Sequence, residues 1–396
     1  MLNKLHDFFA GKNVLLLGLG LEGSSTLQLL EKLNCAKSVM VWEEYHHTRG
    51  TKFPPEYDII MKSPGIPLYE KIGEFDPRIT GQADLFLRFV NREKNPVIGI
   101  TGTKGKSTTS SLVHHILNEC RVNSRLIGNI GVPPLDVAED LTPGEVVVME
   151  LSCHQLEYVQ ASPEYAVLLN IYEDHLDHYI DFKHYKHAKE NIFRFQKPSD
   201  VEIRVENTSC FSREINSIEP EKARIRGKHN IHNMAVALRT VLMLGLRIPP
   251  EQQLEAAYSF GGLEHRLELF AEIDGVKWVN DSISTIPEAA IAAMEAFPEA
   301  DTIIIGGLDR GVDYSVLIDF LKNRPDINVV ALPDSGHKIA DLLGKRTNIY
   351  KACDLAKAVE HAKIVTKACC VLSPAAASYG FYKNFEERGR HFKELI

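Results

Sequence analysis

Residues 97–109 read V-I-G-I-T-G-T-K-G-K-S-T-T, and this stretch decides the fold class of the chain around it. The apolar run from Val97 to Ile100 predicts a buried strand, and a helical pattern runs from about Lys106 to Glu119. The glycines between them let consecutive backbone N–H groups turn toward a phosphate, and the start of the helix adds its dipole. Strand, glycine-rich turn and helix in this order predict a phosphate-binding loop.

The predicted loop comprises Gly102, Thr103, Lys104, Gly105, Lys106, Ser107 and Thr108. Lys106 would reach the terminal phosphates of a nucleotide, and the Ser107 hydroxyl would bind Mg²⁺. The strict P-loop spacing needs a glycine where Ile100 stands, so this is a variant loop. A flexible surface turn would also explain the glycines, but the ordered set of elements favours nucleotide binding.

Ligands for a metal ion follow two further predicted strands. Glu150 ends the apolar run Val146 to Met149, and His175 comes shortly after the run Ala166 to Asn170. The C-terminal ends of parallel strands meet at the ligand-binding edge of a sheet. Because phosphoryl transfer needs cations beside the phosphates, we expect Glu150 and His175 to help hold Mg²⁺.

Zinc is an alternative, because His175/His178 and His184/His187 are pairs spaced three residues apart. No cysteine joins these pairs, and Mg²⁺ already accounts for the neighbourhood. The seven cysteines are scattered without a C-x-x-C pair, so we expect most of them to be reduced core residues.

A second glycine motif lies near the N-terminus. Val14 to Leu17 predicts a strand, Gly18-Leu19-Gly20-Leu21-Glu22-Gly23 follows, and a helical pattern runs from Ser24 to Leu33. The next apolar run, Val39 to Trp42, ends at Glu43-Glu44, where a Rossmann domain places its ribose-binding acid. Alone, this segment would indicate a nicotinamide dehydrogenase, or glycines that only let a helix pack on a strand. A dehydrogenase leaves the loop near residue 100 without a role.

The remainder of the chain again alternates strands with helices. Strands are predicted at 276–279, 302–305, 329–332 and 370–372, and helices near 287–297, 315–321 and 355–366. The polar region 199–226 is expected to hold loops or short strands. The 396 residues therefore predict an α/β fold of three domains: a Rossmann-like domain (1–93), a central P-loop ATPase-like domain with a parallel sheet wrapped by helices (94–262) and a C-terminal Rossmann-like domain (263–396).

Composition narrows the class of partner. A formal net charge of -8 argues against a nucleic-acid or membrane-surface binder. No apolar run approaches the ~20 residues needed to cross a bilayer, and the N-terminus lacks a signal-peptide pattern. We expect a cytoplasmic monomer that binds small molecules.

With these motifs identified, the chain resembles the Mur ligases, ATP-dependent amide-forming enzymes of peptidoglycan precursor synthesis. It most resembles the branch that adds D-glutamate to UDP-N-acetylmuramoyl-L-alanine. The motifs are Gly18-x-Gly20, Ser63-Pro64-Gly65-Ile66, Thr101 to Ser107, Gly128-Asn129-Ile130-Gly131, Glu150-Leu-Ser, Asp174-His175, His229-Asn230-x-x-Asn233, His265-Arg266, Asn280-Asp281-Ser282, Gly306-Gly307-x-Asp309-Arg310-Gly311, Leu372 to Ser378 and Lys383 to Gly389. The resemblance implies that the first domain holds the UDP substrate, the second ATP and the third the amino acid.

The resemblance also implies roles for individual residues. ATP would be held by the loop with Asn230, Asn233, Arg266 and Asp281. The UDP substrate would contact Gly20, Leu21, Glu22, Ser63, Pro64, Gly65 and Asn129, and the amino acid Thr285, Arg310, Ser378, Tyr379 and Phe385. Lys189 matches the family lysine that reacts with CO₂ to give a carbamate, an oxygen ligand for a second Mg²⁺. Catalysis would rest on Lys106, Glu150, His175 and Lys189, with Ser107, Glu150, His175 and Lys189 as metal ligands.

One departure leaves the amino acid open. Ile283 stands after Asp-Ser, where the family often has lysine, so a cation that could meet a glutamate carboxylate is missing. Arg310 could replace it, because a guanidinium grips a carboxylate with two hydrogen bonds. Addition of L-glutamate or another amino acid is the nearest alternative. A folate-polyglutamylating ligase would lack the N-terminal domain, and a non-catalytic nucleotide-binding scaffold is the remaining hypothesis.

Overall fold

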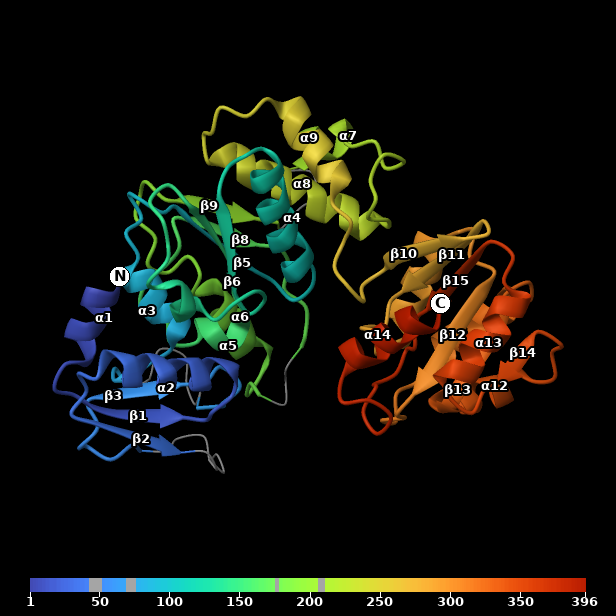
Figure 1. Ribbon diagram of the computed structural model, residues 1–396, viewed down its shortest axis with the longest axis horizontal. Coiled ribbons are helices and arrows are strands. Elements are labelled where there is room, and N and C mark those ends of the chain that lie inside the picture. Colours follow the sequence, from blue (N-terminus) through green and yellow to red (C-terminus); the bar gives the residue numbers. More distant parts are fainter. Residues whose placement is uncertain (43–51, 69–75, 175–177, 206–210) are drawn as a thin grey trace. The chain divides into compact units, whose positions relative to one another are not determined.

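A computed structural model describes residues 1–42, 52–68, 76–174, 178–205 and 211–396 (Figure 1). The chain divides into two compact units, residues 1–218 with 232–257 and residues 219–231 with 258–396. The described strands form two sheets in the first unit and one in the second. The expected α/β class with parallel sheets is confirmed, whereas the domain boundaries near residues 93 and 262 stay predictions.

The N-terminal sheet is parallel and has the order β2-β1-β3-β4. Its strands are β1 (Asn13–Leu17), β2 (Ser38–Trp42), β3 (Ile59–Lys62) and β4 (Ile79–Thr80), and its helices are α1 (Leu2–Phe9), α2 (Leu21–Leu33) and α3 (Gln82–Phe89). The turn between β1 and α2 needs glycine at Gly18, whose φ of 76° is in the left-handed region. The Ser63 hydroxyl donates to the Gly18 carbonyl oxygen over 3.0 Å and so ties this turn to the end of β3.

The central sheet is also parallel, with the order β6-β7-β5-β8-β9. Its strands are β5 (Val97–Thr101), β6 (Ser124–Gly128), β7 (Val146–Glu150), β8 (Tyr165–Leu168) and β9 (Val201–Arg204). The helices that follow these strands are α4 (Lys106–Glu119), η1 (Pro134–Val137), α5 (Cys153–Leu156), α6 (Phe182–Glu190), α7 (Ser212–Ser217), α8 (Lys228–Met243) and α9 (Pro250–Ser259). Strand β5 is buried along its whole length and lies between β7 and β8, so the loop that follows it opens at the middle of the sheet.

The N-terminal and central sheets share one apolar core. A single cluster of buried side chains includes Leu85 and Phe86 of α3 together with Leu135 and Val137 of η1. Gln82 adds polar links, because its Nε2 donates to the Glu22 carbonyl oxygen over 2.9 Å and its Oε1 accepts from the Leu135 backbone N–H over 3.0 Å. This shared interior explains why both sheets belong to the first unit.

The C-terminal sheet has the order β10-β11-β15-β12-β13-β14. Its strands are β10 (Glu268–Ile273), β11 (Val276–Asn280), β12 (Thr302–Gly307), β13 (Asn328–Asp334), β14 (Ile349–Lys351) and β15 (Cys369–Leu372). Its helices are α10 (Pro287–Ala296), α11 (Ser315–Asn323), α12 (Ser335–Leu343), α13 (Leu355–Val365) and α14 (Phe385–Leu395). The chain runs outward from β12 to β14 and then returns to place β15 on the other side of β12. Such a reversal is where open α/β sheets bind ligands, beyond the C-terminal strand ends.

Two local expectations were wrong, and one strand was not predicted. Strand β8 ends at Leu168, so Asn170 lies two residues beyond it rather than at its end. The polar region 199–226 contains the helix α7 (Ser212–Ser217) besides the short strand β9. Strand β10 pairs antiparallel with β11, an edge hairpin that the alternating pattern did not predict.

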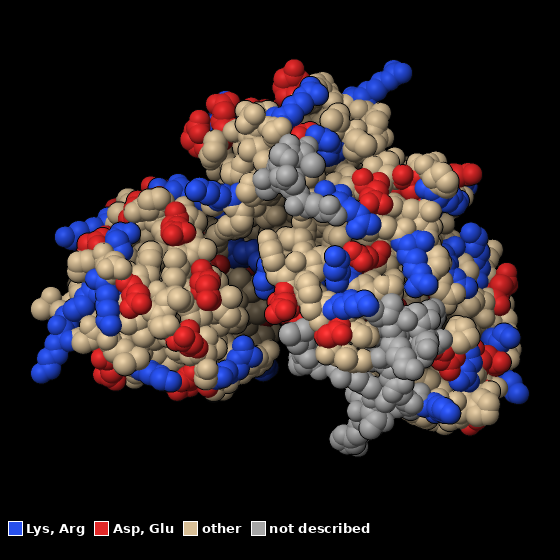
Figure 2. All heavy atoms as spheres, turned by 180° about the vertical axis from the view of Figure 1, so that it is seen from behind, with Lys and Arg blue, Asp and Glu red and all other residues tan. Residues whose placement is uncertain are grey.

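The charged side chains of both signs are mixed on the face shown in Figure 2. Figure 2 shows lysine and arginine interspersed with acidic side chains over one face, as expected for a protein without a single-sign binding field. None of the helices in the described ranges combines the length and the apolar character needed to span a bilayer.

Candidate functional site

The phosphate-binding loop links β5 to α4 as the sequence predicted. Gly102 and Gly105 have φ values of 158° and 87°, and Gly105 is the N-cap of α4. A Cβ atom on Gly105 would lie 2.6 Å from the Asn233 Oδ1 of α8, and the φ of 87° would strain any other residue at this position. Lys106 Nζ donates to the carbonyl oxygens of Gly102 and Thr103 over 2.9 and 3.1 Å, and burial lowers its pKa. The loop therefore has the backbone freedom and the cation that phosphate binding needs.

Asn170 fixes the shape of this loop. Its side-chain Oδ1 accepts from the Lys104 backbone N–H over 2.8 Å, and its Nδ2 donates to the Lys104 carbonyl oxygen over 2.9 Å. Its own carbonyl oxygen accepts from the Thr103 N–H over 2.8 Å. No such role was predicted for Asn170 from the sequence. Its place just after a buried apolar run was the signal that could have indicated it.

Glu150 ends β7 beside the loop and is completely buried. Asn129 Nδ2 donates to its Oε1 over 2.8 Å. The other oxygen, Oε2, is buried and has no hydrogen-bond partner among the described residues. A buried carboxylate oxygen without a donor is costly unless a cation meets it, so this position fits the predicted Mg²⁺ ligand.

Lys189, on α6, is buried and 1% exposed, not solvated as a helix lysine usually is. Its Nζ donates to the Gly102 carbonyl oxygen over 2.7 Å and lies 4.8 Å from the centre of the Tyr185 ring. The pKa of Lys189 is lowered to about 8, chiefly by burial and also by the charge of Lys106, while Cys153, Asp174 and Glu150 act in the opposite direction. Among the described residues no carboxylate pairs with its ammonium group. The fold thus brings Lys106 and Lys189 to the same carbonyl oxygen.

The histidines of the predicted metal site are only partly described. His175 lies outside the described residues, as do Glu43 and Glu44 of the dehydrogenase alternative. His178 Nε2 lies 2.6 Å from Glu157 Oε1, and His184 Nδ1 lies 2.6 Å from Asp181 Oδ1, so these two histidines bond separate carboxylates.

The side chains close enough to share a metal lie elsewhere in the described part of the chain. They are Glu264, His265 and Glu268. Lys393 Nζ already bonds both glutamates there, over 3.1 and 2.7 Å, and no zinc role is assigned to this group.

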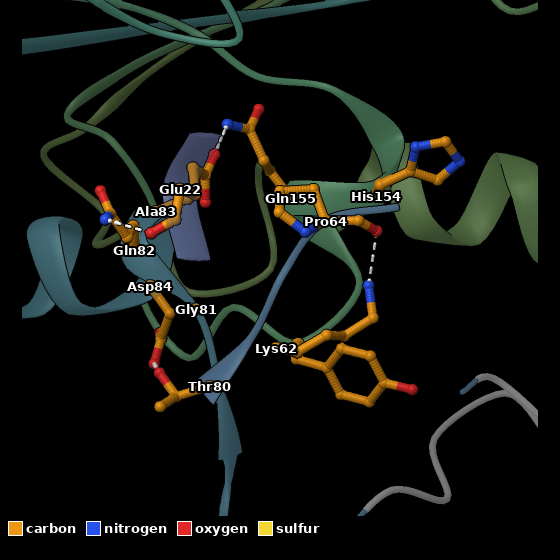
Figure 3. A pocket seen from close by; sticks show the side chains of 11 residues that line it. Glu22, Lys62, Pro64, Thr80, Gly81, Gln82, Ala83, Asp84, His154 and Gln155 are labelled. Atoms are coloured by element: carbon orange, nitrogen blue, oxygen red, sulfur yellow. Dashed lines mark hydrogen bonds between the residues drawn. The ribbon is translucent and has the colours of Figure 1, made fainter. Parts of the chain in front are cut away.

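Two of the residues predicted to contact the UDP substrate, Glu22 and Pro64, lie where the first two sheets meet (Figure 3). A small cavity there is bordered by Glu22, Pro64, His154 and Gln155 among others. Gln155 Nε2 donates to Glu22 Oε1 over 2.6 Å. The Glu22 side chain therefore meets an amide donor of the protein itself, and burial raises its pKa to about 7.

The loops around this cavity differ in exposure. Gly20 and Leu21 are exposed at the start of α2, with Leu21 75% exposed. The Ser63 hydroxyl bonds the Gly18 carbonyl oxygen, and the Pro64 carbonyl oxygen accepts from Lys62 Nζ over 2.7 Å.

Lys62 Nζ also lies 2.9 Å from Glu157 Oε2, and this ion pair joins two buried side chains.

We expect Glu22→Gln to stabilise the protein more at pH 8 than at pH 5. Burial raises the Glu22 pKa in the folded state to about 7, so the unfolded state loses this proton first and stability falls as the pH rises from about 4.5 to 7. Glutamine keeps the oxygen that Gln155 bonds but has no charge. The gain at pH 8 should be about 1–2 kcal/mol, discounted for partial exposure, in urea unfolding. The exposed control is Glu31→Gln. The prediction is contradicted if the free energy of unfolding changes with pH in the same way in both variants.

The remaining predicted residues belong to the second unit. Asp281 Oδ2 accepts from the Ser373 hydroxyl over 2.7 Å and also from Ser284, while its Oδ1 accepts from the Leu267 N–H, and burial raises its pKa to about 6. Asn230 Nδ2 donates to the Arg226 carbonyl oxygen over 2.8 Å. Arg266, Thr285, Arg310, Ser378, Tyr379 and Phe385 are the other predicted residues of this unit.

The second-unit residues differ in burial. Ser378 is buried, Thr285 and Phe385 are half-buried, and Arg310 and Tyr379 are exposed. The boundary between the units falls within α8, so Asn230 belongs to the second unit and Asn233 to the first. The structure thus brings the loop, Asn129, Glu150, Lys189 and Asn233 together in one unit and keeps the amino-acid set in the other.

Comparisons with known proteins identify relatives of this chain. The family model of the Mur ligase middle domain matches residues 100–226. The chain is similar to the UDP-N-acetylmuramoylalanine--D-glutamate ligase of Aquifex aeolicus (strain VF5), with 32% identity over 96% of this chain and 97% of that protein. The corresponding ligase of Geobacter sp. (strain M21) is also 32% identical, over 86% of this chain and 83% of its own length.

Solved structures share the fold. The UDP-N-acetylmuramate-alanine ligase MurC from Thermotoga maritima matches with a TM-score of 0.57 and 20% identity over 97% of this chain and 98% of that one. The MurF ligase from Thermotoga maritima in complex with ADP matches with a TM-score of 0.58 and 17% identity over 98% of this chain and 94% of that one. The identity with the two curated ligases, over nearly their full lengths, assigns the family. The chain belongs to the UDP-N-acetylmuramoylalanine--D-glutamate ligases, a branch of the Mur ligases.

Proposed function

We propose that this protein is an ATP-dependent ligase that joins D-glutamate to the alanyl carboxylate of UDP-N-acetylmuramoyl-L-alanine. One structural observation supports the proposal most directly. The phosphate-binding loop, the buried carboxylate of Glu150 and the buried amine of Lys189 converge at the end of β5. A protein that only bound a nucleotide would have no need of a second buried lysine at the loop.

The reaction proceeds by two transfers. An oxygen of the alanyl carboxylate attacks the γ-phosphorus of ATP, and the bond to the bridging oxygen breaks to give an acyl phosphate and ADP. The amino group of glutamate then attacks the acyl carbon, loses a proton and releases inorganic phosphate. Both steps depend on positioning and on neutralising charge, which the loop N–H groups and Lys106 supply at the phosphates.

We propose that Ser107, Glu150, His175 and carbamylated Lys189 hold Mg²⁺. The orphaned Oε2 of Glu150 fits such a role, and Lys189 is buried where a cation without a partner is costly. A carbamate would turn Lys189 from a cation into an oxygen ligand, and its lowered pKa increases the share of neutral amine that can react with CO₂. Bound Mg²⁺ would supply the positive charge that lets a carboxylate approach the γ-phosphate.

The amino acid would bind to Thr285, Arg310, Ser378, Tyr379 and Phe385 of the second unit. Arg310 is exposed, so its guanidinium is available to a carboxylate. Ile283 is half-buried and its backbone N–H bonds the His265 carbonyl oxygen over 3.1 Å, so this position contributes no cation. The cytoplasmic location and the monomeric state stay predictions from the sequence.

Phosphate release tests the proposal. Purified protein with ATP, Mg²⁺ and UDP-N-acetylmuramoyl-L-alanine should release phosphate when D-glutamate is added, at a rate at least about tenfold higher than with L-glutamate. Reactions without the UDP substrate serve as the control for plain ATP hydrolysis. Faster release with L-glutamate would replace the D-specific function with the related L-adding one. Release with neither amino acid would support the non-catalytic scaffold.

A further inference from the structure

A cavity of about 290 Å³ lies in the second unit at the C-terminal edge of the sheet. Gly306 and Gly307 at the end of β12 form part of its wall, together with Leu332 at the end of β13. The start of α13 and residues of α14 complete it. Its volume is near the lower end of the range of small-molecule sites in proteins, about 300–1,000 Å³. Of the five residues proposed for the amino acid, only Ser378 borders it, so this cavity is a place distinct from most of that set.

Arg388 of α14 borders this cavity and is an unusual arginine. It is 1% exposed, and the bonds of its guanidinium go to neutral groups. Nε donates to the Ser282 hydroxyl over 3.0 Å, and Nη2 donates to the carbonyl oxygens of Ser282 and Ala376 over 2.7 and 3.1 Å. Within the described ranges no carboxylate forms an ion pair with it, and Nη1 has no hydrogen-bond acceptor. A buried cation without an anion is costly, so an anion bound beside Arg388 would be stabilised by its charge.

The free corner of the guanidinium lies beside the cavity wall. A Cβ atom on Gly307 would be 3.0 Å from Arg388 Nη1, and Gly307 itself borders the cavity. Because residue 307 is glycine, it places no side chain of its own between the wall and Nη1. An anion bound against this part of the wall would lie close to the Nη1 N–H groups, which have no acceptor among the described residues.

The rest of the wall restricts the kind of anion. Leu332, Leu355 and Phe381 are apolar, and the Tyr382 hydroxyl bonds His391 Nδ1 over 2.8 Å, so its ring is the part left for a ligand. Asp354 also borders the cavity, where its Oδ1 accepts from the Lys357 N–H. The carboxylate of Asp354 would repel phosphates and other multiply charged anions more strongly than an anion with a single charge. One negative charge and an apolar body match the wall.

We propose that this cavity binds a small organic monocarboxylate, with its carboxylate held by Arg388 and its apolar body against Leu332, Leu355 and Phe381. Arginine meets carboxylates with short, charge-assisted hydrogen bonds, and the enclosed apolar wall strengthens them. Because Ser378 borders the same cavity, the ligand would lie next to one of the five residues proposed for the amino acid. Its binding does not depend on ATP or on the ligase reaction.

Benzoate is a suitable probe, with benzamide as its neutral counterpart and inorganic phosphate as the multiply charged one. Calorimetry on the full chain without ATP should show benzoate binding at least about tenfold more tightly than benzamide or phosphate. Cys353 is exposed and borders the cavity, so benzoate should also slow its alkylation, followed by peptide mass spectrometry. The rate at Cys120, which does not border it, should not change.

Variants decide where benzoate binds. Cys353→Trp fills the cavity from its exposed side and should weaken benzoate binding at least about tenfold. Ile364→Trp, at an exposed position of α13 that does not border the cavity, should leave it unchanged. Arg388→Met should remove the preference for benzoate over benzamide. If that variant does not fold, the comparison of Cys353→Trp with Ile364→Trp still tests where benzoate binds. Equal binding of benzoate and benzamide, or full binding in Cys353→Trp, would overturn the proposal.

Discussion

Replacing Lys189 by methionine is expected to lower kcat for phosphate release by about 10²- to 10³-fold while the melting temperature holds or rises. Methionine keeps the length and the apolar packing of the lysine stem. It removes a buried ammonium group whose described acceptor is the Gly102 carbonyl oxygen, so its loss costs one hydrogen bond and relieves a buried charge. The variant should therefore lose activity without losing stability.

Kinetics and thermal unfolding of the same preparation check this result. Lys186→Met is the matched control, because Lys186 is exposed on the same helix and lies 3.8 Å from Glu190. Its kcat should stay within about twofold of the parent. For Lys189→Ala, which leaves space, short carboxylic acids should restore part of the activity by taking the place of the carbamate. A fully active Lys189→Met would remove the carbamate from the mechanism, and equal losses of activity and stability would make Lys189 a structural residue.

Replacing Lys62 by methionine is expected to destabilise the first unit by about 3–5 kcal/mol. Lys62 and Glu157 are both buried, and Glu157 also bonds His178. Burial alone would raise the pKa of Glu157, but the charges and hydrogen bonds of Lys62 and His178 outweigh it and hold this pKa below its ordinary value. Without Lys62, the carboxylate loses its closest cation in a place that water does not reach.

The double variant Lys62→Met/Glu157→Gln separates the charge from the packing. With both charges removed, most of the lost free energy of unfolding should return. The surface pair of Lys32 and Glu139 in the same unit is the control, since both are exposed and Lys32→Met should cost less than about 1 kcal/mol. Urea unfolding measures all three. A cost below about 1 kcal/mol for Lys62→Met would show that the buried pair adds no net stability.

The sequence was most informative where structure is local. The strand from Val97, the glycine turn and the helix from Lys106 lie within 25 residues, and their periodicity and glycines follow from backbone geometry alone. The hairpin of β10 and β11 was missed, because an alternating pattern of strands and helices does not reveal an antiparallel edge strand.

Distant contacts could not be read from local patterns. Lys189 bonds Gly102, which lies 87 residues earlier, and Gln155 bonds Glu22, which lies 133 residues earlier. Nothing around Lys189 distinguishes it from the exposed lysines of the same helix, so its burial is visible only in the fold. Its proposed role came from the family resemblance and stays a prediction, as does that of His175, which the structure does not describe.

The interior shared by α3 and η1 has a consequence for engineering. Residues 1–93 form a sheet of their own, yet Leu85 and Phe86 are buried in the same cluster as Leu135 and Val137. A chimaera that takes its first 93 residues from a relative would set foreign side chains against this surface and leave Gln82 or its substitute without matching partners. Transplanting the substrate-binding half of such a ligase therefore requires the facing segment around residues 134–138 to travel with it.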